Sequence, residues 1–348
     1  MKINNIVFTL GCIGLIVVML LDKLYWGNDI FAEGWPDSSP GHIIRSLIIL
    51  TSVLAMILSL IANGILLANR PTFRLDENNK VPVEQLSILA VLSISVAFLL
   101  LFIFNPAMFN TLSLEDGIIE WGSFALLFAS GMIAAISLFL SLNISAIPKS
   151  TQFSIALLCL IFFVIAMEEV SWLQRTLEIE TPQIFIANIQ HEMNLHNFYT
   201  NPIENIYYNG VFLFLVILPF IRFLFPCILD SHYLRIFVAR PFIAVIGSVA
   251  CAYNFDMWNI IFTQIAFFAS LLILCTFFMF GSRNEKYIIS FTIFHLTATQ
   301  LIFLVKGENF ARIWEVTEYK ELFIPLALFI YSMDLFVYMK RARSSEKS

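Results

Sequence analysis

The sequence has few charged residues: Asp, Glu, Lys and Arg together make up 13% of its 348 positions. Because soluble domains carry about 25% charged residues, this composition excludes an ordinary soluble protein. Its five cysteines all lie in apolar runs, with neither zinc-site nor disulfide-framework spacing. Rossmann and P-loop fingerprints, internal repeats and low-complexity segments are also lacking. These absences exclude nucleotide-binding folds of those two types and small disulfide-stabilised domains.

What the sequence does contain is long apolar runs, which raise the hydrophobic share to 59% and the mean hydropathy to +0.84. A transmembrane helix needs about 20 apolar residues. Spans are predicted near residues 5–22, 43–68, 85–104, 117–142, 153–174, 205–226, 238–253, 258–281, 287–305 and 315–339. The seventh is the weakest, because Pro241 and the polar YNFD sequence leave it short. The first lacks a small-residue cleavage site, which favours a retained span over a removed signal peptide.

The predicted fold class is therefore an all-α polytopic transmembrane bundle of about ten spans, forming a single integral membrane domain over residues 1–348. Ten spans place both termini on one side, and that side holds fourteen of the twenty Lys and Arg residues. Since cytoplasmic loops carry the excess of Lys and Arg, both termini are expected in the cytoplasm, with a short basic tail at 340–348. All six tryptophans and eighteen of the 25 acidic residues fall toward the outer face.

The first candidate site residues are two adjacent glutamates, Glu168 and Glu169, at the outer end of the fifth predicted span. Charged groups inside a membrane are usually functional. A protonated and an ionised carboxylate side by side could act as general acid and base. Trp172 and Arg175 follow as candidate substrate contacts, and Arg175 would bind an anionic group of the substrate. The alternative is a solvated helix end with Arg175 as a salt-bridge partner.

The segment that follows, an outer-face loop over 175–203, is predicted to contain a short interfacial helix near 182–195. Helical spacing would align Asn188, Glu192 and His196 in one polar stripe. Asn188 is then a candidate substrate contact, His196 a candidate catalytic group, and Glu192 with His196 a candidate metal-ligand pair at i, i+4. The cofactor is left open, with a divalent metal as one option. The alternative is an ordinary polar helix face.

Three further acidic residues, Glu120, Glu315 and Glu318, lie at predicted outer helix ends and are expected to complete the same pocket. Arg312 precedes Glu315 and is a second candidate to bind an anionic substrate group. The alternative for this segment is a structural ion-pair network. His295 lies in the middle of the ninth predicted span, where it either hydrogen-bonds a neighbouring helix or relays protons.

The sequence resembles a family of bacterial polytopic membrane proteins that has no established activity. The resemblance rests on EDGIIEW (115–121), EEVSWLQR (168–175), ETPQIFIANIQHEMNLHN (180–197) and RIWEVTE (312–318), which are 40 of the 348 residues. It implies a bacterial source and a multi-pass protein of the inner membrane. It supports the choice of site residues but implies no reaction.

A second, partial resemblance is to the CAAX-processing intramembrane proteases, whose pattern is E-E-x-x-x-R, then F-x-x-x-H, then a further histidine motif. Here Glu168 and Glu169 are followed by Arg175, two residues later than in that family. Phe291 and His295 fit the second motif. Since His295 is the last histidine in the chain, the third motif is missing.

Three functions remain open at this point. The first is a membrane-embedded enzyme, such as a hydrolase or transferase, acting at an outward-facing site on a lipid, a lipid-linked molecule or a membrane peptide. The second is a cation- or proton-coupled transporter, which would use the deeper residues His295 and Asp334. The third is a non-enzymatic scaffold or assembly factor. Membrane lipids are the expected partners and nucleic acid is not; the oligomeric state is left open.

Overall fold

The computed structural model describes residues 2–27, 31, 33–68, 73–74, 83–188 and 191–347; the side chains of Lys2, Leu67, Ala68, His196, His232 and Lys347 are not described. Over this part of the chain the secondary structure is helical, and the only β-type pairing is an isolated bridge between Phe73 and Gly281. Nine of the described helices are long and apolar enough to cross a membrane. The predicted all-α class is confirmed, and the chain has the architecture of a multi-pass membrane protein.

The helices run in both directions through one bundle. The long ones are α1 (Lys2–Leu24), α2 (Pro40–Ala68), α3 (Val83–Phe104), α5 (Ile118–Ser141), α6 (Lys149–Glu169), α11 (Ile261–Phe280), α12 (Arg283–Val305) and α13 (Glu315–Lys347). A further crossing is built from α7 (Thr200–Phe212), a π-helical segment (Leu213–Ile217) and α8 (Leu218–Leu224). The short helices are α4 (Pro106–Leu112), α9 (His232–Phe237) and α10 (Pro241–Ala250).

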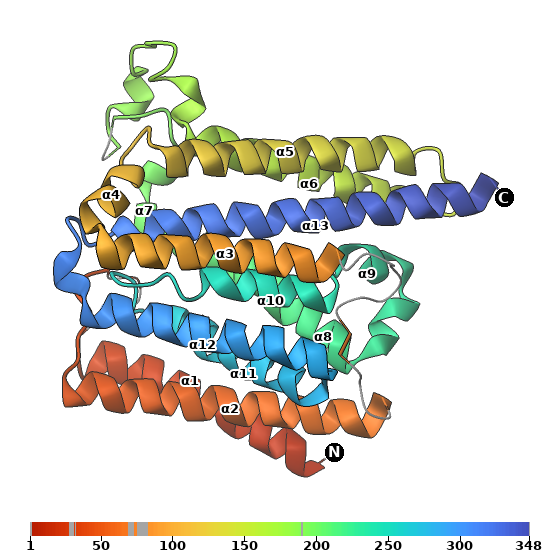
Figure 1. Ribbon diagram of the computed structural model, residues 1–348, viewed down its shortest axis with the longest axis horizontal. Helices are drawn as coiled ribbons and strands as arrows, with labels where there is room; N and C mark the ends of the chain where they lie inside the picture. Colours follow the sequence, from red (N-terminus) through yellow and green to blue (C-terminus); the bar gives the residue numbers. More distant parts are fainter. Residues whose placement is uncertain are drawn as a thin grey trace.

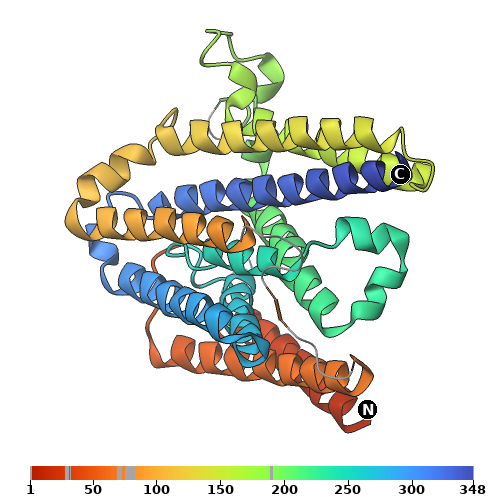
Figure 2. The same cartoon turned by 45° about the vertical axis from the view of Figure 1, so that its right-hand side comes forward.

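The bundle has three layers, which Figure 1 shows from bottom to top. Helices α1 and α2 pack as a hairpin at one edge, α11 and α12 lie with α3 and α10 in the middle, and α13 packs against α5, which packs against α6. Figures 1 and 2 both place the N- and C-termini at the same end of the helices, which we call the terminal end. The opposite end, which carries the 105–117, 170–199 and 306–314 connections, is called the acidic end.

Helix α10 lies at the centre of the core and is buried on all sides, from Phe242 through Ala250. It is only ten residues long, too short to cross a membrane as a helix. The non-helical segment 251–260 continues from its end toward the acidic end of the bundle (Figure 1). The predicted seventh span, 238–253, is thus a half-length helix followed by irregular chain. Such chain is tolerated at membrane depth only where protein surrounds it, and Tyr253 and Phe255 are indeed buried.

The contact between α10 and the π-helical segment depends on a glycine. A Cβ atom on Gly247 would lie 3.0 Å from Leu215 Cβ and 3.2 Å from Val216 Cγ2. A larger residue at 247 would therefore press on the π-helical segment, which would have to shift by a few tenths of an ångström. This close approach holds the composite α7–α8 crossing against the central helix.

Large apolar side chains cover the outside of the bundle. On α1, residues such as Ile6, Leu10 and Ile13 are exposed, although the helix is almost entirely apolar. In water a surface of this kind would drive aggregation, whereas in a bilayer it contacts lipid tails. The exposed surface agrees with a multi-pass membrane protein.

Candidate functional site

Five glutamates from four helices meet at the acidic end of the bundle and form what we call the carboxylate cluster. They are Glu120 of α5, Glu169 of α6, Glu204 of α7, and Glu318 and Glu321 of α13. Glu169 is the hub, because it interacts electrostatically with each of the other four. All five side chains are partly buried. The structure thus brings together three predicted site residues, Glu120, Glu169 and Glu318.

Hydroxyl and amide groups hold the cluster in place. The Tyr208 hydroxyl donates a hydrogen bond to Glu321 Oε1, and Glu120 Oε2 accepts one from the Asp116 backbone N–H at 2.6 Å. Ser123 donates to the Glu321 carbonyl at 3.1 Å, which ties α5 to α13. The Tyr207 hydroxyl is buried without a hydrogen-bond partner among the described residues and lies within electrostatic range of Glu169. A polar group placed there could accept a hydrogen bond from this hydroxyl.

Two acidic residues outside the spans, Glu33 and Asp256, extend the cluster. Burial, together with the nearby Asp256 carboxylate, raises the pKa of Glu33 from 4.5 to about 7. Burial also raises the pKa of Asp256 from 3.8 to about 6, although the Thr317 hydroxyl, which donates to it at 2.8 Å, and the Lys320 ammonium act in the opposite direction. Both groups interact electrostatically with Glu204. These carboxyl groups therefore titrate near neutral pH.

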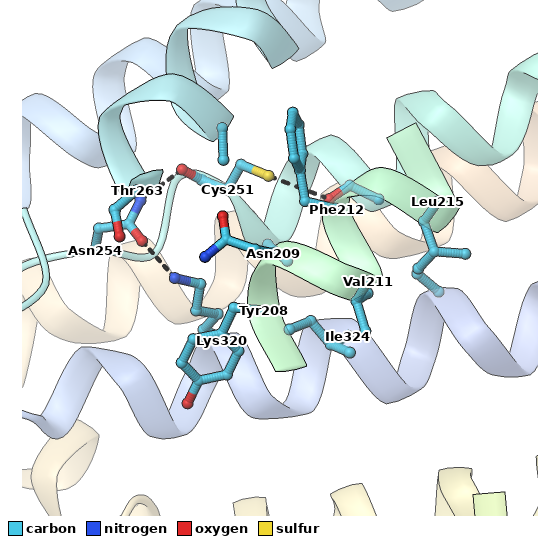
Figure 3. A pocket seen from close by; sticks show the side chains of 14 residues that line it. Tyr208, Asn209, Val211, Phe212, Leu215, Cys251, Asn254, Thr263, Lys320 and Ile324 are labelled. Carbon is cyan, nitrogen blue, oxygen red and sulfur yellow. Dashed lines mark hydrogen bonds between the residues drawn. The ribbon is translucent and has the colours of Figure 1, made fainter. Parts of the chain in front are cut away.

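A buried lysine, Lys320, separates this acidic region from a narrow pocket between α7, α10, α11 and α13. Its Nζ donates to Asn254 Oδ1 at 2.7 Å and lies 4.6 Å from the centre of the Tyr208 ring. Figure 3 shows Lys320, Asn254 and Asn209 at the polar end of the pocket, with Phe212, Leu215 and Ile324 along its apolar part. The volume of the pocket is about 30 Å³, so it can hold only a small group.

Glu168 and Glu169, adjacent in sequence, have different environments. Glu168 accepts hydrogen bonds from Trp172 Nε1 and from the Leu195 backbone N–H, both at 2.7 Å. Glu168 and Trp172 therefore serve the local structure in this conformation, whereas Glu169 joins the carboxylate cluster. The helix predicted to continue to residue 174 ends at Glu169.

The chain leaves α6 through a left-handed turn. Ser171, Trp172 and Leu173 have φ angles of 48°, 55° and 61°. The left-handed region costs a non-glycine residue roughly 1–2 kcal/mol, and three in succession are unusual. This turn directs the Ser171 hydroxyl to Glu192, to which it donates at 2.6 Å.

The prediction of an interfacial helix near 182–195 is wrong for the residues that the structure describes. Only a 3-10 turn, Gln183–Phe185, forms there, and residues 191–195 are not helical. The cause is Asn188, whose side chain accepts from the Glu192 N–H at 3.1 Å and donates to the Glu192 carbonyl at 2.6 Å. Asparagine competes with helix formation in this way. Asn188 is buried inside the loop, and its hydrogen bonds to the Glu192 backbone stabilise the loop.

Arg175 and Glu192 form the centre of an ion-pair network. The Arg175 guanidinium pairs with Glu192, with Asp116 at 2.9 Å and with Glu115 at 3.7 Å. Burial acts to lower its pKa, but the contacts with Asp116 and Glu192 outweigh burial and raise the pKa. The network links the 170–199 loop to the start of α5. The predicted metal-ligand pair of Glu192 and His196 lies partly outside the described part of the structure, because the side chain of His196 is not described. Among the described side chains, no three His, Cys, Asp or Glu residues could hold a metal ion together.

Arg312 and Glu315 lie beside the cluster and contact protein groups. Arg312 donates to Asn110 Oδ1 at 3.2 Å and to the Ser113 carbonyl at 2.7 Å. Glu315 is buried, and its Oε2 accepts from the Ala311 N–H at 2.9 Å, while its Oε1 has no partner among the described residues. These contacts fix the start of α13 and hence the positions of Glu318 and Glu321.

The two deeper ionisable residues have separate partners. His295 Nε2 lies 2.7 Å from the Ser95 hydroxyl of α3, and Ser95 lies 2.8 Å from the Tyr253 hydroxyl. His295 thus contacts a neighbouring helix, as the first of its two predicted roles requires. Asp334 pairs with Arg240 near the terminal end, at 2.5 Å. In the described part of the chain neither residue forms a hydrogen bond or ion pair with the carboxylate cluster.

Sequence reasoning missed Glu204, Glu321 and Tyr207. Glu204 lies in α7, which begins at Thr200, more than thirty positions after Glu169, and no local pattern links the two glutamates. Glu321 could have been found, because it follows Glu318 at i+3 on the same face of α13.

Comparisons of the chain with protein-family models, with curated proteins and with solved structures found no match. The fold and the site described above are therefore the basis on which its function is inferred.

Proposed function

We propose that this protein is a membrane-embedded enzyme of the bacterial inner membrane, with an outward-facing site formed by the carboxylate cluster. Its substrate is a lipid, a lipid-linked molecule or a membrane peptide. The observation that carries the proposal is the convergence of Glu120, Glu169, Glu204, Glu318 and Glu321 from four helices around one partly buried point. Isolated acidic residues in a membrane protein find a basic partner, whereas five that gather together share protons.

The chemistry follows from the arrangement. Carboxylates that share a low-dielectric site can hold a proton on one member and leave another ionised, so the pair offers an acid and a base at once. Glu169, as the hub, is assigned the base, and Glu318 or Glu321 the acid. Tyr207, Tyr208 and Lys320 supply hydrogen-bond donors beside them. Arg175 and Arg312, proposed to bind an anionic group, are engaged with protein groups here and would bind it only by exchanging these contacts.

The orientation is part of the same proposal. By the sequence assignment, fourteen of the twenty Lys and Arg residues fall on the side of the termini, so the terminal end is assigned to the cytoplasm under the positive-inside rule and the cluster faces outward. Helix α10 with the irregular chain after it, up to Phe255, then counts as the seventh of ten crossings. Ten crossings agree with two termini at one end of the bundle, as Figure 1 shows.

The test is a deletion of the gene in the source bacterium, followed by profiling of its membrane lipids. Wild-type protein supplied on a plasmid should restore the profile, and Glu169→Gln should fail to restore it at equal abundance in the membrane. Ser154→Ala, a half-buried position on the same helix α6 far from the cluster, is the matched control and should restore it. Restoration by Glu169→Gln would contradict the proposal.

A second candidate function, proton- or cation-coupled transport, is favoured by one observation. Helix α10 stops inside the bundle beside a π-helical segment, and discontinuous helices of this kind form the substrate and ion sites of transporters. Lys320 and Asn254, at the end of the pocket, would then lie on the path. A pH-gradient-driven flux in proteoliposomes that Lys320→Met abolishes would support transport; a flux-free preparation would leave the enzyme as the function.

A further inference from the structure

A second pocket lies at the terminal end of the bundle, between α8, α9 and α13, away from the carboxylate cluster. Its volume is about 240 Å³, against about 30 Å³ for the pocket at Lys320. Apolar and aromatic side chains line it together with four arginines and two acidic residues, which are Arg222, Arg235, Arg240, Arg341, Glu84 and Asp334. We call it the arginine pocket.

The charges of the pocket do not cancel. Both acidic residues pair with Arg240, which donates to Asp334 at 2.5 Å and 2.9 Å and to Glu84 at 2.6 Å. Two other arginines donate to backbone carbonyls: Arg235 Nε to that of Leu229 at 2.7 Å, and Arg222 to that of Val238. The six charged lining residues carry a formal charge of +2, from four arginines and two acidic residues. The pocket is therefore suited to an anion.

The position of the pocket matches that of a lipid head group. It lies at the terminal end of α13, where Arg341 follows the apolar run, and Arg235 and Arg341 are both exposed. The apolar lining below them, from Ile236 and Leu335, can contact the first carbons of an acyl chain. Arginine forks bind phosphate oxygens in pairs, and basic pockets between membrane helices suit anionic head groups.

We propose that the arginine pocket binds the phosphate group of an anionic phospholipid, with Arg235 and Arg341 as its principal contacts and Arg222 behind them. The ion triad of Arg240, Glu84 and Asp334 forms the rigid wall of the site and ties α3 and α13 to the start of α10. Lipid bound there would brace α8, α9 and α13 together at the terminal end. This site is independent of the carboxylate cluster.

The test is native mass spectrometry of the full-length protein in detergent, titrated with dioleoyl phosphatidylglycerol or dioleoyl phosphatidylcholine. The wild type should retain phosphatidylglycerol at about tenfold lower concentration than phosphatidylcholine, as about 1.4 kcal/mol of charge-assisted contact requires. Arg235→Gln with Arg341→Gln should remove this preference, and Arg235→Lys should weaken it. Arg283→Gln removes the same charge from an exposed site at the same end, outside the pocket, and should leave the preference intact.

The remaining outcomes are also assigned. Displacement of phosphatidylglycerol by millimolar inorganic phosphate would place free phosphate, and not a lipid, in the pocket, with the same arginine contacts. Equal retention of the two lipids by the wild type would overturn the proposal. A preference that survives in Arg235→Gln and Arg341→Gln protein with an unchanged melting temperature would also overturn it.

Discussion

At the scale of single residues, the structure assigns different roles to side chains that look alike in the sequence. Glu168 and Glu169 are neighbours, yet the first is held by Trp172 and by the Leu195 N–H, and the second faces four other glutamates. The sequence indicated that both glutamates matter. It could not indicate which one faces the cluster, because that depends on where α6 ends.

The first prediction separates the two roles by stability. A glutamine at 168 can accept only one of the two hydrogen bonds and presents its amide N–H₂ to the other donor. Glu168→Gln is therefore expected to lower the free energy of unfolding by about 1–3 kcal/mol, whereas Glu169→Gln is expected to leave it unchanged or raise it, since it removes a mutually repelling charge. Thermal unfolding in detergent measures both. Equal losses would show that the two residues have the same structural role.

The second prediction concerns pH and Glu33. Its folded-state pKa of about 7 lies above the unfolded value of 4.5, so the folded state binds the proton more tightly. This stabilisation is complete below the unfolded pKa and is lost as the pH rises through the folded pKa. Between about pH 5 and pH 8 the wild type should lose roughly 1–2 kcal/mol more than Glu33→Gln, allowing for the partial exposure of the group. If the free energy of unfolding changed with pH by the same amount in both proteins, the buried environment assigned to Glu33 would be ruled out.

At the scale of helices, the apolar runs predicted most of the elements because membrane spans need length and hydrophobicity alone. Two predictions about elements depended on tertiary contacts. The 182–195 segment lost its helix because Asn188 bonds the backbone of Glu192. The seventh span became a half-helix because the polar residues after Cys251 find partners inside the core, such as Gln300 with Asn254 at 2.7 Å.

The third prediction tests the contact that places α10. Gly247→Val would force branched methyl groups against Leu215 and Val216, where even a Cβ lies at 3.0–3.2 Å. Overpacking of this kind costs about 1–3 kcal/mol, so the melting temperature should fall. Gly210→Ala in α7 is the matched control, because nothing lies within 4 Å of its Cβ and alanine favours the helix by up to about 1 kcal/mol. A Gly247→Val protein as stable as the wild type would show that the two helices are not in close contact.

At the scale of the whole molecule, the separation of charge gives the bundle two chemically different ends. The carboxylate cluster lies at one end, and both termini and the arginine pocket lie at the other. The excess of Lys and Arg on one side was visible in the sequence. The convergence of five glutamates from four helices was not, since it depends on how distant helices pack.

The fourth prediction follows from the proposed orientation. Green fluorescent protein fused to the C-terminus should fluoresce, because it folds in the cytoplasm. Alkaline phosphatase fused after Glu178, an exposed residue of the acidic-end loop, should be active, because it requires export. The reverse pair of results would invert the orientation and place the carboxylate cluster inside the cell.

The central claim, that the carboxylate cluster is a catalytic site for a membrane substrate, is tested most directly by one measurement. Purified protein in lipid nanodiscs would be incubated with a bacterial lipid extract, and mass spectrometry would follow species that disappear and appear with time. We expect time-dependent conversion by the wild type and at least a hundredfold slower conversion by Glu169→Gln, the usual loss when an acid–base group is removed, about 10²–10⁴-fold. Conversion by Glu169→Gln at the wild-type rate, or no conversion by the wild type, would contradict the account.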